Sequence, residues 1–160
     1  MAKFMVGSGI SQYISSLEDI SIVGPGIKIA VYKGAKIVAD AVRAEIESLP
    51  TYGRGGWDPE GRKISSAQKA GLLDGFGISN MKVDNGIVNV KLGFDGYNKT
   101  VTENYPFGQP NAMIARSIVS GTSFRAKNDF IGRAVRKTKA NAEKVMADAI
   151  HEYFNNKMWK

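Results

Sequence analysis

The chain lacks cysteine altogether and contains a single histidine, His151, among its 160 residues. The first absence excludes disulfide bonds, thiolate nucleophiles and thiolate zinc sites. The second excludes any metal site built from several histidines, and a histidine-based catalytic triad would have to use His151. No apolar run approaches the roughly 18 to 20 residues that a membrane-spanning helix needs. We therefore expect no membrane partner and a chain that is cytoplasmic at synthesis.

The excess of positive charge is unevenly distributed along the chain. The formal net charge is +7, and residues 125–160 hold nine basic against four acidic side chains. Five of the seven excess positive charges therefore lie in this segment, which favours anionic partners, either nucleic acid or acidic protein surfaces. Because its basic and acidic residues alternate and no base-reading motif occurs, we expect nucleic-acid binding to be non-specific at most.

The length and an apolar content of 43% fit one globular domain over residues 1–160. Helical spacing of apolar residues predicts a short helix in an N-terminal arm, residues 1–24, which closes near Asp19. After a break at residues 24–26, the same spacing predicts a helix at about 27–49. The apolar stripe of this helix is Val31, Ala35, Val38, Val42, Ile46 and Leu49.

A second long helix is predicted at the C-terminal end, at about 128–155. Its apolar stripe is Ile131, Val135, Thr138, Ala142, Val145, Ala149 and Tyr153. A shorter helix is predicted to begin at Asn111, as its cap, and to end at Gly121. Residues 65–76 are predicted to add one or two further helical turns.

The clearest local pattern is "ISNMKVDNGIVNVKLGF", residues 78–94. Asn85-Gly86 between alternating runs predicts a type I′ hairpin turn, which pairs Asp84 with Ile87. Continued in step, the same register pairs Met81 with Val90. One face of the hairpin, expected to be the core face, then carries Met81, Val83, Val88, Val90 and Leu92. The predicted fold class is α+β, with an antiparallel sheet around this hairpin covered by the two long helices.

Gly121-Thr122-Ser123 could present backbone amides to a phosphate group. A phosphate cradle, however, normally leads straight into the N-terminus of a helix. The next predicted helix begins several residues later, and Gly121 stands where a helix C-cap belongs. The sequence therefore favours a turn.

Two further motifs are near-misses to catalytic ones. Residues 56–63, "GWDPEGRK", have the glycine separation of a nucleotide P-loop, but Arg62 and Lys63 replace the lysine and the Ser/Thr that such a loop needs. Ser66 and Lys69 have the serine–lysine spacing of penicillin-recognising enzymes, without their companion motifs. We expect no catalytic residues, no cofactor and no metal.

Residues 51–63 contain four glycines and a proline without apolar periodicity, which predicts a flexible loop of a length that is typical of functional or disordered loops. Aromatic and arginine side chains are the usual anchors of protein interfaces. The candidate partner contacts are Tyr52, Arg54, Trp57, Arg62, Lys63, Arg133, Lys137 and Trp159. Two interpretations of Trp57 stay open: it anchors a partner, or it pins its own loop to the core.

The order of several motifs resembles a known family. "GLLDGFGIS" leads into the hairpin, "GFDGY" follows it, and "IARSIVSGTS" precedes "DFIGRAV" at the start of the last helix. Over about residues 27–154 the chain is similar to the phage tail-component family named for gene product ten of a lambdoid long-tailed phage. The chain departs from that family at the glycine-rich loop, and Asp129 stands where a proline is usual.

The resemblance implies a non-enzymatic virion structural protein that acts in head–tail joining or tail completion. Its implied partners are other phage tail or connector proteins, with self-association into a ring. Its implied place is the virion, at the tail or the head–tail junction, after assembly in the host bacterial cytoplasm. The alternative function is that of a small basic nucleic-acid-binding protein.

Overall fold

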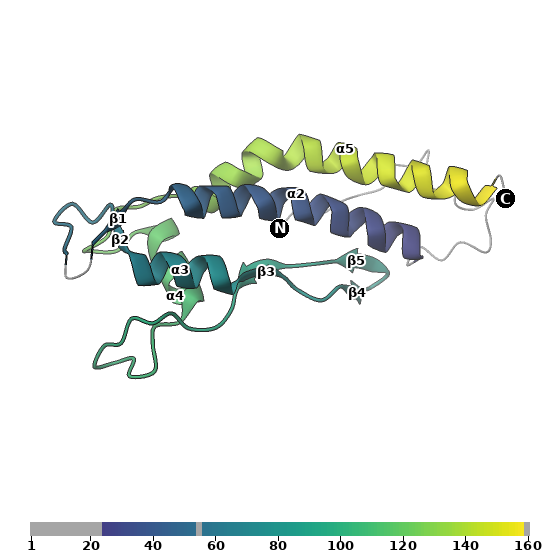
Figure 1. Cartoon of the computed structure of the whole chain (residues 1–160). Coiled ribbons are helices and arrows are strands. Elements are labelled where there is room, and N and C mark those ends of the chain that lie inside the picture. The colour runs from purple at the N-terminus through teal and green to yellow at the C-terminus, as the bar shows by residue number, and fades with distance from the viewer. Residues whose placement is uncertain (1–23, 54–55, 159–160) are drawn as a thin grey trace.

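The structure is a computed structural model of the chain, and it describes residues 24–53 and 56–158. Two long helices, α2 (Pro25–Ser48) and α5 (Phe130–Met158), lie side by side and run antiparallel along the molecule (Figure 1). Beneath α2 lie the shorter helices α3 (Ser66–Gly75) and α4 (Asn111–Ser120) and a two-stranded hairpin. The α+β class is therefore confirmed. The short helix expected before Asp19 falls outside the described residues.

Six short strands in the described part of the chain form three separate pairs. The strands are β1 (Thr51–Tyr52), β2 (Ile64–Ser65), β3 (Phe76–Ile78), β4 (Lys82–Asp84), β5 (Ile87–Asn89) and β6 (Leu92–Phe94). Strand β1 pairs with β2 in parallel, whereas the pairs β3–β6 and β4–β5 are antiparallel and follow one another along the hairpin. The hairpin lies against α2, which contacts both β3 and β5.

The predicted turn is confirmed: Asn85 and Gly86 both have positive φ, 52° and 77°, as a type I′ turn requires. The predicted register holds from Asp84↔Ile87 to Lys82↔Asn89. Beyond that pair the first strand contains one extra residue before Ile78 meets Leu92. The observed ladders do not include Met81 and Val90, so the predicted pairing of these two residues stays a prediction; the extra residue forms a bulge between the two ladders.

The extra residue has a reason in the sequence. The apolar residues of the first strand are even-numbered at Phe76 and Ile78 but odd-numbered at Met81 and Val83. Since side chains alternate between the two faces, one inserted residue keeps all four on the same face. The pattern therefore explains the bulge, although the regular register did not predict it.

The expected core face of the hairpin is only partly buried. The side chain of Val83 is 42% exposed, and Met81, Val88, Val90 and Leu92 are half-buried. The prediction that Val83 is a core residue is wrong. The physical reason is length: the hairpin tip extends past α3 and α4, and α2 is the helix that contacts it there (Figure 1).

The hydrophobic core lies at the other end of the molecule, where all four described helices meet. Phe76 and Phe94 pack with ring centroids 5.1 Å apart, and Phe130 stands edge-on to Phe94 at 6.4 Å. These rings join β3 and β6 to the first residue of α5. The buried core residues are Ala39, Val42, Ile46, Leu49, Ile64, Leu72, Phe76, Ile114, Ala115, Ile118, Phe130 and Ala134.

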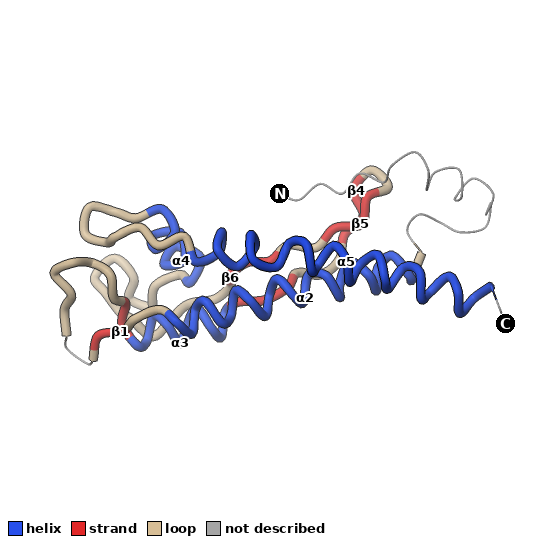
Figure 2. Tube along the Cα trace, turned by 90° about the horizontal axis from the view of Figure 1, so that it is seen from above, coloured by secondary structure: helices blue, strands red, loops and turns tan. Residues whose placement is uncertain are grey.

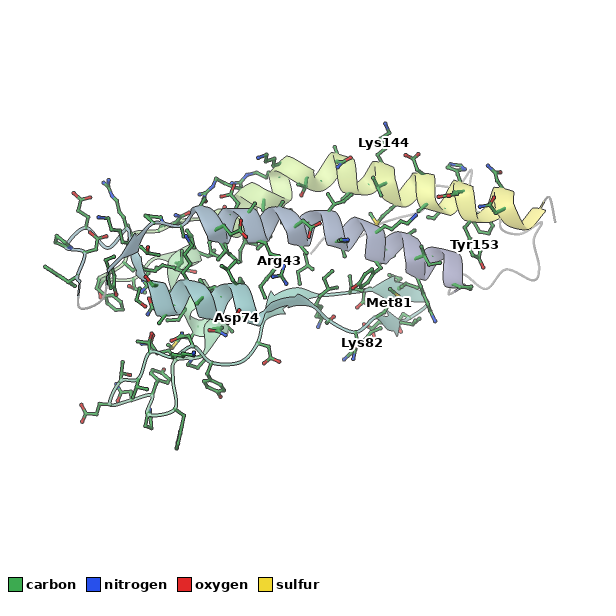
Figure 3. All side chains as sticks on the ribbon, in the orientation of Figure 1. Arg43, Asp74, Met81, Lys82, Lys144 and Tyr153 are labelled. Atoms are coloured by element: carbon green, nitrogen blue, oxygen red, sulfur yellow. The ribbon has the colours of Figure 1, made fainter. Side chains whose placement is uncertain are left out.

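Small residues let α2 and α5 approach each other closely. Gly26, Ala30 and Gly34 follow one another at four-residue intervals and are all buried. An added Cβ at Gly26 would collide with the ring of Tyr153, which points from α5 toward α2 (Figure 3), and one at Gly34 would collide with Met146. Of the break predicted at residues 24–26, only Gly24 is non-helical in the structure, as the extended N-cap of α2. The helix begins at Pro25, two residues earlier than predicted, because proline is well suited to the first turn of a helix.

The buried stripe of α5 differs from the predicted one at its start. Phe130 and Ala134 are fully buried, whereas Val135 is 40% exposed, so Val135 was wrongly assigned to the stripe. The helix also begins at Phe130 rather than near residue 128. Asp129 accepts a hydrogen bond from the backbone N–H of Gly132 at 3.0 Å and so caps the first turn.

Helices α2 and α3 cap each other with cations. Lys69 on α3 donates from Nζ to the carbonyls of Glu47 and Leu49 at the end of α2, at 2.6 and 3.0 Å. Arg43 on α2 points toward the end of α3 (Figure 3) and donates to the carbonyl of Phe76 at 2.7 Å. Positive charge stabilises the C-terminus of a helix, where carbonyls lack partners. The lysine of the Ser66–Lys69 pair therefore has a structural role, since its side chain binds the end of α2.

Candidate interaction surface

Three loops lie toward one end of the molecule: two of them lie beside β1, and the remaining one, residues 95–110, extends below α3 and α4 (Figures 1 and 2). They are residues 53–63, residues 95–110 and residues 121–129, and we call them together the three-loop end. Residues 54 and 55 are outside the described part of the chain. The first and third loops touch: Ala126 donates its backbone N–H to the carbonyl of Gly61 at 3.0 Å. An added Cβ at Gly61 would lie 2.5 Å from the carbonyl oxygen of Phe124.

The first loop is organised around its own carboxylate. Asp58 accepts hydrogen bonds from the backbone N–H groups of Glu60, Arg62 and Lys63. The hydrogen bond from Lys63 is the main cause of a lowered pKa of Asp58. The amides that a P-loop would offer to phosphate therefore bind a carboxylate of the same loop.

The third loop follows α4 as a tight turn. Gly121 ends α4 with φ 74°, and the backbone N–H of Thr122 donates to the carbonyl of Arg125 at 2.9 Å. The amide of Thr122 is thus used within the turn. The prediction that Gly121-Thr122-Ser123 is a turn after a helix C-cap is confirmed.

The second loop is fixed by two buried asparagines. Asn98 accepts a hydrogen bond from the N–H of Thr100 at 2.8 Å, and Asn111 donates from its side chain to the carbonyl of Asp95 at 2.8 Å. Both side chains pack against Gly71 of α3. The prediction that Asn111 caps α4 is wrong: Pro110 is the cap residue, and Asn111 ties the helix to the preceding loop.

One buried side chain, Gln68 on α3, connects all three loops. Its Nε2 donates to Oε1 of Gln109 at 2.8 Å, and its Oε1 accepts from Arg125 at 3.3 Å. The same oxygen accepts from the backbone N–H of Ser65, which follows the first loop, at 3.3 Å. Ser65 and Gln68 also form a capping box that starts α3. The fold therefore holds the three loops in a defined relation to one another.

Large apolar side chains are exposed on each of these loops. Trp57 is 82% exposed, Phe107 93% and Phe124 75%. Tyr97 and Val101 on the second loop are exposed as well. Of the two interpretations of Trp57, the structure excludes the one in which it pins its loop to the core.

Of the exposed apolar side chains on these loops, the sequence predicted only Trp57 as a contact residue. Tyr97, Val101, Phe107 and Phe124 were not predicted. Aromatic residues in a turn-rich stretch such as "DGYNKTVTENYPFGQP" have no periodicity that separates buried from exposed positions. Only the observation that such a stretch lacks an apolar period could have drawn attention to Tyr97 and Phe107.

The predicted contact residues do not form one cluster. Trp57, Arg62 and Lys63 belong to the three-loop end and Tyr52 to the adjoining strand β1, whereas Arg133 and Lys137 lie on α5. Two of the predicted cations already have acidic neighbours. Arg62 lies 3.4 Å from Glu60, and Arg133 pairs with Glu45 of α2 at 2.8 Å. Arg54 and Trp159 lie outside the described residues.

A second, smaller apolar surface lies at the opposite end of the molecule. Ile29 and Tyr32 on α2 and Val83 and Ile87 on the hairpin are exposed there. Strand β5 contacts α2, so these side chains belong to neighbouring elements. We call this the hairpin end.

Within residues 24–53 and 56–158, no group of three or more His, Cys, Asp or Glu side chains is arranged to hold a metal ion. None of the helices in that part of the chain is long and apolar enough to cross a membrane. Comparisons of the chain with protein-family models, with curated proteins and with solved structures find no match. The resemblance to the phage tail-component family thus stays a prediction.

Proposed function

We propose that this protein is a non-enzymatic structural component of a bacteriophage or prophage virion. It acts in tail completion or head–tail joining, through contacts with other tail or connector proteins. The observation that carries the proposal is the exposure of large apolar side chains on three loops that the buried Gln68 connects through hydrogen bonds. Exposed apolar patches on a rigid scaffold are typical of protein-binding surfaces. The family resemblance supplies the virion as the setting.

The two exposed apolar surfaces also support the proposal of self-association into a ring. In a ring with head-to-tail contacts, each subunit presents two different surfaces to its neighbours. The three-loop end and the hairpin end are different surfaces at opposite ends of α2 (Figure 1). The same arrangement would let one surface serve the neighbouring copy and the other a different virion protein.

The proposal is tested by deleting the gene from the phage or prophage that carries it. We expect particles in which tails are incomplete or unattached to heads when viewed by electron microscopy, and restoration by the wild-type gene. Antibodies against the chain should label purified wild-type virions. Normal particles of full infectivity after the deletion, or virions that lack the chain, would contradict the proposal.

A further inference from the structure

Arg125 is a half-buried cation whose hydrogen-bond partners are neutral. Its guanidinium donates to Oγ of Ser117 at 3.2 Å and to Oε1 of Gln68 at 3.3 Å. In the described part of the chain, no carboxylate lies within ion-pair distance of it. Burial lowers the pKa of Arg125, and Tyr52 nearby opposes this, but an arginine stays charged at neutral pH.

Among the described residues, no carboxylate pairs with the charge of Arg125. A partly desolvated cation loses hydration, and neutral acceptors replace only part of what it loses. A guanidinium also offers donors in a planar fork that matches the two oxygens of a carboxylate. The two neutral hydrogen bonds of Arg125 use only part of this donor set.

The surroundings of Arg125 favour a protein as the source of that carboxylate. Phe124 next to it is exposed, and Trp57 is exposed on the loop that touches Phe124 and Arg125 at Gly61. Arginine beside aromatic side chains is the composition of binding hot spots between proteins. The net charge of +7 also makes acidic protein surfaces the complementary ones.

We infer that Arg125 receives an aspartate or glutamate of the partner protein, in a segment whose apolar residues pack against Phe124 and Trp57. This inference rests on the proposed function and names the chemistry of the partner surface. Gln68 and Ser117 each take one donor of the guanidinium, which leaves its other donors for the carboxylate of the partner. In this contact the ion pair between Arg125 and the partner's carboxylate is surrounded by apolar side chains, which exclude water from it.

The test uses the full-length protein as bait for a library of displayed random peptides. We expect the enriched peptides to contain Asp or Glu next to aliphatic or aromatic residues. The best peptide is then titrated by calorimetry against the wild type, Arg125→Gln and Lys144→Gln. Lys144 projects from α5 away from α2 (Figure 3) and serves as the matched control for loss of one charge.

The inference predicts that Arg125→Gln weakens binding about tenfold or more, while Lys144→Gln leaves it unchanged. Replacing the acidic residue of the peptide by its amide should weaken binding equally, with no further loss when combined with Arg125→Gln. Gln68→Glu offers a second variant: it places a carboxylate beside Arg125 and should also lower the affinity. Circular dichroism and thermal melting check that each variant is folded.

Four results would overturn the inference. They are the absence of enriched peptides, enriched peptides without acidic residues, equal loss of affinity in Lys144→Gln, and a single-stranded oligonucleotide that competes for the site. The proposed function is judged separately by the presence of the chain in virions. Virions that contain the chain, together with peptides insensitive to Arg125→Gln, would remove the inference and leave the proposed function standing.

Discussion

At the scale of single residues, Gln68 is the side chain on which the arrangement of the three loops depends most. It bridges Ser65, Gln109 and Arg125 from a buried position on α3. Replacing its amide with an apolar group leaves three half-buried polar partners without these hydrogen bonds, which lowers stability. The side chain of Gln68 thus contributes to stability and also holds the three loops in place.

We expect Gln68→Leu to lower the free energy of unfolding by about 1–3 kcal/mol. The measurement is urea unfolding followed by circular dichroism, with Lys144→Leu as the exposed control, which should change stability by less than about 0.5 kcal/mol. Equal stability of Gln68→Leu and the wild type would show that the amide does not connect the loops as described.

Asp58 provides a pH-dependent test of the first loop. Hydrogen bonds from backbone amides, that of Lys63 first, lower its pKa from the ordinary value of 3.8. A carboxyl group whose pKa is lower in the folded state stabilises the fold above its unfolded-state pKa. That contribution disappears as the pH falls through the folded-state pKa.

Asp58→Ala should therefore melt at a lower temperature than the wild type at neutral pH. The gap between the two melting temperatures should shrink in acid, below the folded-state pKa of Asp58. Thermal melts of both proteins across that range provide the measurement. A gap that is constant or that widens in acid would be inconsistent with the carboxylate holding the loop.

At the scale of elements, what the sequence predicts depends on whether local chemistry is sufficient. The Asn85-Gly86 turn and the end of α4 at Gly121 were predicted correctly because both need positive φ, which asparagine and glycine adopt most readily. Val83 and Val135 were assigned to the core wrongly, because apolar periodicity does not show how far neighbouring elements extend.

The close contact of α2 with α5 was missed for a related reason. Glycine inside a helix usually weakens it, so the sequence did not indicate that Gly26 and Gly34 lie at a contact between helices. Their meaning depends on Tyr153 and Met146, which lie more than a hundred residues further along the chain. Apart from Trp57, the exposed aromatic residues of the three-loop end were missed likewise, since burial there depends on tertiary packing.

A double-mutant cycle tests the contact between Gly34 and Met146. In the Met146→Ala background, Gly34→Ala should stabilise the protein by about 1 kcal/mol, because alanine favours the helix. With Met146 present, the added methyl group overlaps its side chain, and the cycle should show unfavourable coupling of about 1–3 kcal/mol. Chemical denaturation of the four proteins measures the coupling. Additive effects would mean that the helices are further apart than described.

At the scale of the whole molecule, the buried core and the exposed apolar side chains lie in different parts of the fold. Two long helices and a core at one end hold loops whose apolar side chains face solvent, while the hairpin end carries a second exposed surface. The glycines and cations that resemble ligand-binding motifs instead shape turns, cap helices and form ion pairs. We propose that the exposed apolar side chains of the three-loop end bind other virion proteins.

Photo-crosslinking inside assembled virions tests this claim most directly. A photo-activatable amino acid is introduced at Phe124, and in a parallel phage at Lys144 on the outer side of α5 (Figure 3). After illumination of purified virions, we predict a covalent adduct between the chain and another virion protein from position 124 and none from position 144. An adduct from Lys144 alone, or from neither position in virions that contain the chain, would contradict the account.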